Sequence, residues 1–436
     1  MIRTLSDDTL LVFLSDCHIG GDEGRAIFET PDELARLFAD IDRHHGPVEL
    51  VLAGDFFDFL RIASVAPASN RAAATMAEPQ FADLFTALKR LAAGNQRHVV
   101  YLPGNHDAEA WWNPDIRRHL IDGGYIHEMV LSYAAAFASR PDKVIYSEHG
   151  NEFDPQNRIT DYGDRLDRPF GDHVVTDIIP RLPRGRTATA LQINDIDRVF
   201  PLSILPEWLA GRLFYALVTQ AVRWLLVPIA VAYVAFETIA FFVGVGRKSI
   251  NTLFIDVIYD VALLIVAFAL FFLLARRMAN RALHSGTKSS PEQGEAIDAA
   301  TAVIRAMLEK GEPPPLAGEP VGDIAVFVSG HTHAPAVTPF LRPAGGSGAL
   351  INSGCWLRQL QALRTHFRLP TVFLSRFVQT HVRVRLVDGK VRAEIWDYPR
   401  AADQSLRIAE RLAVLGRLPR EPEPDAPPKL IAAMEV

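Results

Sequence analysis

Five short apolar runs in this chain, each of strand length, end in a loop that carries aspartate, asparagine or histidine. The runs are Leu10–Leu14, Val48–Ala53, His98–Leu102, Val144–Tyr146 and Ile324–Ser329. Most of the loops also contain a glycine, which permits a tight turn after the strand. Because ligands collect at the carboxyl ends of strands in α/β sheets, we expect the five loops to meet at one site. The pattern therefore predicts an α/β fold with a polar site at the strand ends.

The polar residues of these loops offer only oxygen and nitrogen donors. They are two aspartates, one asparagine and four histidines, namely Asp16, His18, Asp55, Asn105, His149, His331 and His333. In a chain with two cysteines, such a set suits divalent Mn, Fe, Co, Ni or Zn better than a thiolate site does. Seven ligands are too many for one ion, but they fit two ions that share a carboxylate. The sequence predicts two divalent metal ions, with manganese as the first choice.

In chain order the loops read Asp-x-His, Gly-Asp-x-x-Asp, Gly-Asn-His-Asp, His-Gly and Gly-His-x-His. This series resembles the calcineurin-like metallophosphoesterase superfamily over residues 8–160 and 320–398. The resemblance implies a four-layer α-β-β-α sandwich, with helices on both outer faces of two packed sheets. It also implies a hydrolase in which a metal-bound hydroxide attacks the phosphoester and no phosphoenzyme forms.

The resemblance further implies a role for each residue of the site. One metal would take Asp16, His18 and His333. The other would take Asn105, His149 and His331, while Asp55 would bridge the two ions. His106 would stabilise the transition state or protonate the leaving oxygen, and Asp107 would hold His106 in orientation. Asp58 would either act on the metal site through another side chain or cap a helix.

Two motifs bear on the substrate. Ser-Asp-Cys-His-Ile-Gly and Gly-Asp-Phe-Phe-Asp-Phe are most similar to the branch that contains UDP-2,3-diacylglucosamine hydrolases, which split a pyrophosphate. This implies a phosphodiesterase or pyrophosphatase with a phosphoester substrate that is lipid-linked and amphiphilic, although the segment after His149 lacks the cysteine-containing pattern of that branch. The alternative is a membrane-tethered phosphatase that acts on phosphoproteins, nucleotides or other small phosphoesters. A non-catalytic scaffold would have lost ligand residues, and none is lost.

Two longer apolar runs, Trp224–Gly246 and Leu253–Ala275, are each long enough to cross a bilayer. The short connection between them predicts a helical hairpin. Five basic residues flank its open end and two lie in its turn (Arg212, Arg223, Arg276, Arg277 and Arg281 against Arg247 and Lys248), which favours a catalytic domain on the cytoplasmic side of a membrane. The carboxylates of Glu237, Asp256 and Asp260 leave two other readings open: a buried or dimerising helical pair, and a hairpin in the membrane interface.

The remaining pattern gives the domain organisation. We expect a metallophosphoesterase domain in two parts, residues 1–200 and 284–400, an apolar hairpin insertion at 201–283, and a helix with a proline-rich tail at 401–436. Helices are predicted from Pro31, with Thr30 and Glu33 as a capping box, over Phe81–Leu91 and over Ala296–Lys310. Val382–Leu386 and Val391–Trp396 flank an Asp-Gly turn typical of a β-hairpin.

Composition excludes several classes of protein. Two cysteines in 436 residues exclude a disulfide scaffold, and the N-terminal apolar run is too short for a secretory signal. The net charge of −6 gives no overall attraction to nucleic acid and leaves only a local basic patch open, so no nucleic acid is expected as a partner. Arg181, Arg184 and Arg186 would hold anionic groups or form a solvated loop, and Trp111-Trp112 would wall a pocket or pack in the core. The sequence gives no oligomeric state.

Overall fold

The computed structural model of the 436-residue chain describes most of its residues. These are residues 2–22, 25–62, 64–65, 69–181, 199, 204–244, 249–286, 293–319, 321–366, 369–404, 406–423 and 426–436.

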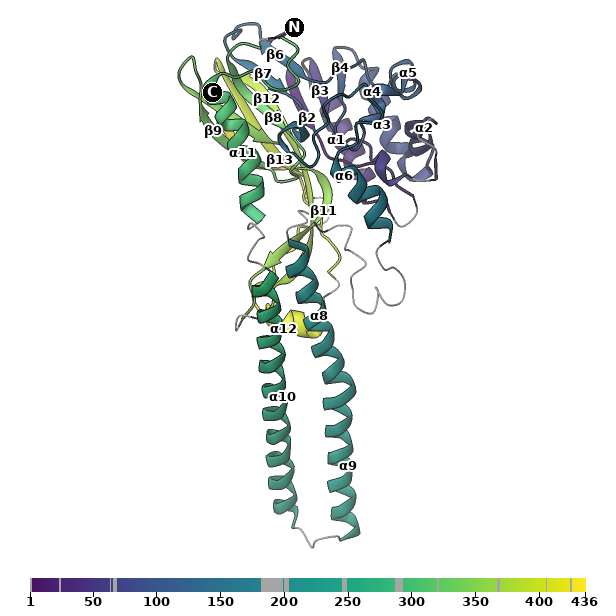
Figure 1. Ribbon diagram of the computed structural model, residues 1–436, viewed down its shortest axis with the longest axis vertical. Helices are drawn as coiled ribbons and strands as arrows, with labels where there is room; N and C mark the ends of the chain where they lie inside the picture. Colours follow the sequence, from purple (N-terminus) through teal and green to yellow (C-terminus); the bar gives the residue numbers. More distant parts are fainter. Residues whose placement is uncertain are drawn as a thin grey trace.

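Two β-sheets packed face to face form the centre of the globular part (Figure 1). The six-stranded sheet consists, in order, of β1 (Arg3–Leu5), β6 (Tyr133–Phe137), β7 (Val144–Ser147), β8 (Ile324–Ser329), β10 (Ser347–Asn352) and β9 (Ala336–Leu341). The eight-stranded sheet consists of β14 (Lys429–Glu435), β13 (Lys390–Asp397), β12 (Val372–Val387), β2 (Leu10–Leu14), β3 (Val48–Ala53), β4 (Arg97–Leu102) and β5 (Glu128–Met129), with β11 (Trp356–Leu363) beside β12. Strands from before and after the apolar runs share both sheets, so the globular part is built from two separated stretches of sequence.

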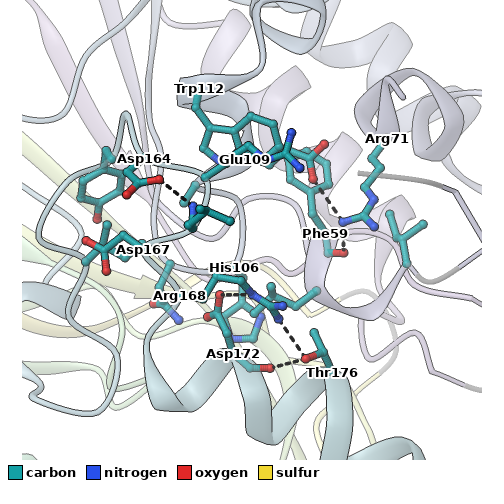
Figure 2. A pocket seen from close by; sticks show the side chains of 18 of the residues that line it. Phe59, Arg71, His106, Glu109, Trp112, Asp164, Asp167, Arg168, Asp172 and Thr176 are labelled. Atoms are coloured by element: carbon teal, nitrogen blue, oxygen red, sulfur yellow. Dashed lines mark hydrogen bonds and ion pairs between the residues drawn. The ribbon is translucent and has the colours of Figure 1, made fainter. Parts of the chain in front are cut away.

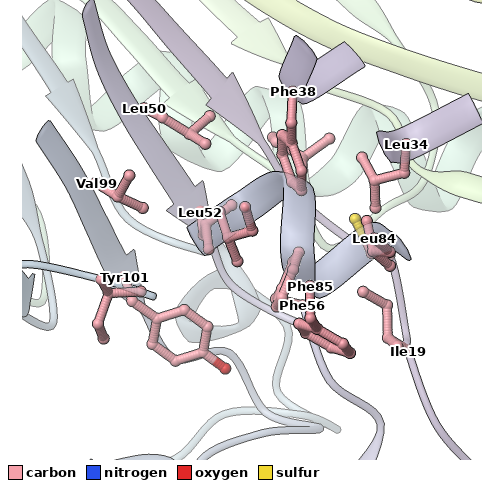
Figure 3. Close-up of a cluster of buried hydrophobic side chains, with 14 of the residues drawn as sticks. Ile19, Leu34, Phe38, Leu50, Leu52, Phe56, Leu84, Phe85, Val99 and Tyr101 are labelled. Atoms are coloured by element: carbon pink, nitrogen blue, oxygen red, sulfur yellow. The ribbon is translucent and has the colours of Figure 1, made fainter. Parts of the chain in front are cut away.

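The alternation of side chains along the strands builds the layers. In β2, Leu11 and Phe13 pack between the sheets, whereas Leu10, Val12 and Leu14 face outward. The outward face of the eight-stranded sheet is covered by α1 (Pro31–Asp42), α3 (Ala82–Ala92) and α5 (Pro114–Asp122). Figure 3 shows side chains of α1 and α3 in this buried cluster. On the other side, α11 (Gln293–Lys310) covers the six-stranded sheet. The predicted four-layer α-β-β-α sandwich is therefore confirmed.

Short helices complete the globular part. They are η1 (Phe59–Arg61), α2 (Arg71–Met76), η2 (Pro79–Phe81), α4 (Glu109–Trp112), η3 (Asn151–Phe153), α6 (Phe170–His173), η4 (Val174–Ile178) and η5 (Ile179–Arg181). The five strands predicted before the polar loops are present, two of them one residue longer at one end. The predicted capping box of α1 is wrong, because Thr30 makes no side-chain cap and Glu33 pairs instead with Arg400 at 2.9 Å.

The two apolar runs form long helices that extend from the globular part side by side (Figure 1). The first is continuous through α8 (Leu205–Ala221), η8 (Val222–Leu226) and α9 (Val227–Val243), and the second is α10 (Ile250–Gly286). Both are long and apolar enough to cross a membrane by length and composition. Large side chains along them face outward, with Trp224 71% and Phe242 80% exposed, so the pair is not buried within the described part of this chain. The predicted turn residues Arg247 and Lys248 lie outside the described residues.

Polar groups of the hairpin turn towards its interior. Glu237 is buried, Asp256 and Asp260 are half-buried, and the Tyr233 hydroxyl donates a hydrogen bond to Asp260. A bilayer disfavours charge on its lipid-facing surface, so this arrangement removes the main objection to insertion.

The base of the hairpin is anchored in the globular part. Phe214 and Tyr215 of α8 pack against β12 and α12 (Ile408–Ala413), and the Tyr215 hydroxyl donates to the Pro370 carbonyl at 2.7 Å. Arg212 is buried and pairs with Glu410 at 3.3 Å. The sequence analysis counted Arg212 among the basic residues that flank the open end of the hairpin. The structure shows instead that Arg212 is a buried ion-pair partner inside the globular part.

The C-terminal tail contains a strand that the sequence analysis did not predict. The proline-rich stretch is followed by β14, which pairs with β13 at the edge of the eight-stranded sheet. The segment lacks the apolar alternation of a buried strand, since most of its side chains are exposed on both faces. An edge strand of this kind is recognised only once its neighbour is known.

Candidate metal centre

The five predicted loops meet at the carboxyl ends of β2, β3, β4, β7 and β8. Backbone hydrogen bonds join the loops directly: the amides of Asp16 and His18 donate to the carbonyls of Gly54 and Asp55 at 3.0 and 2.9 Å. The Gly330 amide donates to the His149 carbonyl at 2.8 Å, which joins the β7 and β8 loops. The His331 amide donates to both carboxylate oxygens of Asp16, at 3.1 and 3.0 Å, across the two sheets. The loops therefore form one rigid framework between the sheets.

The first group of side chains contains Asp16, His18 and His333, whose donor atoms all lie within 4.8 Å of one another. Nε2 of His333 is 3.1 Å from Asp16 Oδ1 and 3.2 Å from Nε2 of His18. All three residues are buried. This is the set that the sequence assigns to one metal.

The second group contains Asp55, His149 and His331, again with donor atoms within 4.8 Å. Nε2 of His149 lies 3.2 Å from Asp55 Oδ2, while Nδ1 of His149 is 3.0 Å from the Ala53 carbonyl oxygen, which fixes the ring. Asp55 Oδ2 is also 3.7 Å from Nε2 of His18 in the first group. Asp55 thus lies between the two groups, at the place that the bridging ligand requires.

Asn105, the seventh predicted ligand, lines the same cavity as His18, Asp55, His331 and His333. Its Oδ1 atom is buried and has no hydrogen-bond partner within the described part of the chain. A buried amide oxygen without a partner is costly, and a cation would remove that cost. All seven sequence-predicted ligands are therefore brought together.

The electrostatics also fit divalent cations. Asp16 and Asp55 are both buried, which raises the pKa of a carboxyl, yet His149 and His106 hold the pKa of Asp55 well below its usual range. Burial lowers the pKa of His149, but Asp55 and Asp16 raise it to about 10. The field of these carboxylates therefore favours positive charge here, and hard oxygen and imidazole donors suit divalent ions.

The backbone at the site is strained. Asp16, His18, Asp55, His331 and His333 have φ between +51° and +67°, a conformation that non-glycine residues rarely adopt. In the described part of the chain only Gln96 and Asp388 share it among non-glycine residues. Such strain persists where the surroundings over-determine the backbone, as they do at binding sites. Five of the seven proposed ligands thus adopt a backbone conformation that is rare for residues other than glycine.

Three glycines make room for the ligands. A Cβ atom at Gly54 would lie 2.2 Å from Nδ1 of His149, and one at Gly104 would lie 2.3 Å from Oδ1 of Asp55. A Cβ atom at Gly330 would lie 2.2 Å from Oδ2 of Asp16. The glycines beside the motif residues therefore serve close approach of the ligands as well as turn formation.

His106 is held by Asp58, at a distance of 3.0 Å between Nδ1 and Oδ1. The predicted partner, Asp107, turns away, because its carboxylate accepts hydrogen bonds from the Gly104 and Phe57 amides and the Tyr101 hydroxyl. The prediction that Asp107 orients His106 is therefore wrong. Asp58 makes no helix cap, and its Oδ2 lies 3.4 Å from Nδ1 of His18 and 2.9 Å from Arg61, so it supports both histidines.

Replacing Asp58 tests this correction. We expect Asp58→Asn to lower kcat about 10- to 100-fold, because both His18 and His106 lose a charged partner. Asp107→Asn is the matched variant. We expect it to lower the melting temperature, because Asp107 stabilises the Gly104 turn, and to lower kcat less than Asp58→Asn does. A larger loss of kcat for Asp107→Asn than for Asp58→Asn would restore the original assignment.

One supporting residue lies outside the predicted ligand set, although its place soon after the His149 loop made it a candidate to line the site. Oδ2 of Asp154 lies 3.1 Å from Nε2 of His331 and accepts a hydrogen bond from the Asn157 side chain. Its proximity to the His149 loop was the available signal, but proximity in sequence does not show which histidine it meets. Arg181 ends η5, and Arg184 and Arg186 lie outside the described residues.

Two cavities adjoin the centre, and Asn105 and His106 line both. The smaller, about 150 Å³, lies over the ligands and has apolar walls that include Val174, Val175 and Leu357. The larger, about 420 Å³, is lined by ten carboxylate and arginine side chains and also by apolar and aromatic ones that include Trp112 (Figure 2). Trp111 instead packs against the core. Both cysteines are buried, which raises their pKa and disfavours a thiolate.

Comparison with known proteins agrees with this geometry. No curated protein matches the chain significantly. Residues 9–210 match the family model described as calcineurin-like phosphoesterase. The match contains Asp16, His18, Asp55, Asn105 and His149, and it ends before His331 and His333. Residues 9–210 are therefore similar to calcineurin-like phosphoesterases.

Proposed function

We propose that this protein is a dinuclear metal-dependent phosphoester hydrolase, either a phosphodiesterase or a pyrophosphatase. The observation that carries the proposal is the convergence of all seven predicted ligands in two groups with Asp55 between them. Together with the family match, this convergence argues against a scaffold that keeps only the fold.

The two groups would hold one cation each. We assign Asp16, His18 and His333 to one cation, and His149 and His331 to the other, together with Asn105, which lines the same cavity as His331. Asp55 would serve both. Divalent cations bound there would lower the pKa of water and neutralise negative charge on phosphoryl oxygens. Manganese is our first choice, since carboxylate, amide and imidazole donors all suit it.

His106 would supply the proton for the leaving oxygen. Burial lowers the pKa of His106, but the charges of Asp58 and Asp55 raise it to about 9, which favours the protonated ring. Because Asp58 holds Nδ1, Nε2 is the nitrogen left to donate a proton into the cavities that His106 lines.

Metal removal tests the hydrolase. We expect purified protein with Mn²⁺ to hydrolyse bis(p-nitrophenyl) phosphate, to lose that activity in EDTA, and to regain it when Mn²⁺ is returned. The reason is that the attacking water would depend on the bound cations for its activation, and both cysteines are buried. Full activity after exhaustive chelation would exclude the metal mechanism.

We further propose that the hairpin tethers the enzyme to a membrane. The outward apolar side chains of α9 and α10 and the inward turn of Glu237 support this. With Arg212 paired to Glu410, four basic residues still flank the open end (Arg223, Arg276, Arg277 and Arg281) against two in the turn, which supports a cytoplasmic catalytic domain.

Removal of the hairpin tests the tether. We expect a variant with residues 224–275 replaced by a short Gly/Ser linker to leave the membrane fraction, whereas the full chain resists carbonate extraction. The α8 contacts with β12 and α12 remain in this variant, so hydrolysis of a water-soluble diester reports that it is folded. A full chain that remains soluble would contradict the tether and favour a dimerising arm.

A lipid-linked substrate, such as a UDP-diacylglucosamine-like molecule, fits this arrangement. The apolar walls of the smaller cavity come from η4 and β11, which lie on the side of the globular part that faces the hairpin (Figure 1). An amphiphile in the membrane would therefore meet an apolar wall beside the metal centre.

A further inference from the structure

The segment formed by α6 and η4, residues 170–178, lies between the two cavities beside the metal centre. Phe170, Gly171, Val174 and Val175 line the smaller cavity. Asp172, Thr176 and Asp177 line the larger one. The spacing of each set is that of one helix face, so a single short helical segment presents an apolar face to one cavity and a polar face to the other.

The polar face is organised for recognition. Figure 2 shows Asp172 and Thr176 on one side of this segment, together with Arg168 and His106. Arg168 donates to the Thr176 hydroxyl at 3.0 Å, and its Nε lies 3.8 Å from Asp172 Oδ2. Asp172 is 6% exposed, and its Oδ1 has no hydrogen-bond partner within the described residues. A ligand that donates a hydrogen bond to this buried carboxylate oxygen would remove the cost of leaving it without a partner.

The charge of the larger cavity limits what it can bind. Its lining has six carboxylates against four arginines, and one of those arginines, Arg71, is committed to Glu109 at 3.1 Å. This balance does not favour a second phosphate group. The mixture of carboxylates and arginines favours a ligand group that both donates and accepts hydrogen bonds, as hydroxyl groups do. The ring of Trp112 in the cavity wall can pack beside such a hydroxylated group.

We propose that segment 170–178 sorts the two substituents of a phosphodiester or pyrophosphate, with the apolar substituent in the smaller cavity and a hydroxylated substituent in the larger. The inference rests on the proposed function, because a phosphoryl group beside Asn105 and His106 would have one cavity on each side. It makes Asp172, Val174 and Val175 specificity-determining residues. The substrate class is then a diester that joins an apolar group to a polyol or sugar.

Binding of two phosphonate monoesters with unactivated alkoxide leaving groups tests the sorting. Hexyl methylphosphonate and glyceryl methylphosphonate are titrated calorimetrically into the Mn²⁺-loaded full chain in detergent. We expect the near-isosteric double variant Val174→Thr/Val175→Thr to weaken the hexyl ester about tenfold and to leave the glyceryl ester unchanged. We expect Asp172→Asn to do the reverse, by about tenfold, because it removes the acceptor charge for a hydroxyl.

The control is Ile178→Ser, in the same segment but lining neither cavity and 49% exposed, which should bind both probes as the unaltered chain does. Any pattern other than the crossed one, including failure of the unaltered chain to bind either probe, overturns the inference. Hydrolysis of bis(p-nitrophenyl) phosphate is measured separately. Crossed binding without hydrolysis would refute the proposed catalysis and keep the sorting.

Discussion

Asp55→Asn is expected to lower kcat/KM for bis(p-nitrophenyl) phosphate on the order of 10³-fold and to lower the bound metal from two ions per chain to one or none. Asp55 is the carboxylate common to both ligand groups, 3.2 Å from His149 and 3.7 Å from His18. Asparagine keeps the shape and an oxygen for the His106 amide, which now donates to Oδ1 at 2.8 Å, but it removes the charge that holds two cations together. Metal content by plasma mass spectrometry and steady-state kinetics measure the two effects.

A second buried carboxylate provides the control for Asp55. Glu394 is fully buried in β13 and pairs with Arg385 and Arg392 away from the centre. Glu394→Gln should lower stability while retaining both ions, so a loss of metal in Asp55→Asn cannot be attributed to loss of a buried charge in general. An Asp55→Asn enzyme with two ions and a near-normal rate would reject the bridging role.

His106→Ala is expected to lower kcat by about 10²- to 10⁴-fold for a dialkyl diester and by much less for bis(p-nitrophenyl) phosphate. The difference arises because an alkoxide needs a proton as it leaves, whereas p-nitrophenolate is stable without one. Both metal ions should be retained, since the groups Asp16–His18–His333 and Asp55–His149–His331 are complete without His106.

The leaving-group dependence distinguishes proton donation from a structural role. Loss of packing around Asp58 would slow both substrates alike, because His106 also holds Asp58, and Asp58 supports His18. Equal losses for the two substrates would therefore show that His106 positions the site and does not donate a proton.

Much of the centre could be predicted because its ligands obey a local rule. Asp16, Asp55, Asn105, His149 and His331 each follow an apolar strand, and the carboxyl ends of parallel strands lie at one edge of a sheet. The adjacent glycines were visible in the sequence as turn residues. Their closeness to the ligands, such as 2.3 Å from a Gly104 Cβ to Asp55, emerges only in three dimensions.

The supporting residues could not be predicted in the same way. Asp58 and Asp107 both lie next to the motifs, and both have the chemistry to orient a histidine. Which of them meets His106 depends on the turn after β4, where the Gly104 amide captures Asp107 and leaves His106 facing Asp58. Asp154 meets His331 across 177 residues of sequence, and this contact depends on the loops after β7 and β8 lying side by side.

Local patterns in the sequence were enough to predict the class of fold, the seven proposed donors and the two apolar helices, because strand alternation, ligand chemistry and hydrophobic length are local properties of a chain. Three-dimensional packing was needed to find that Asp58 and not Asp107 supports His106, that Arg212 is an internal ion-pair partner, and that residues 170–178 present opposite faces to two cavities. These outcomes depend on contacts between segments far apart along the chain, and the free energy of such contacts is set by packing geometry that no local pattern records.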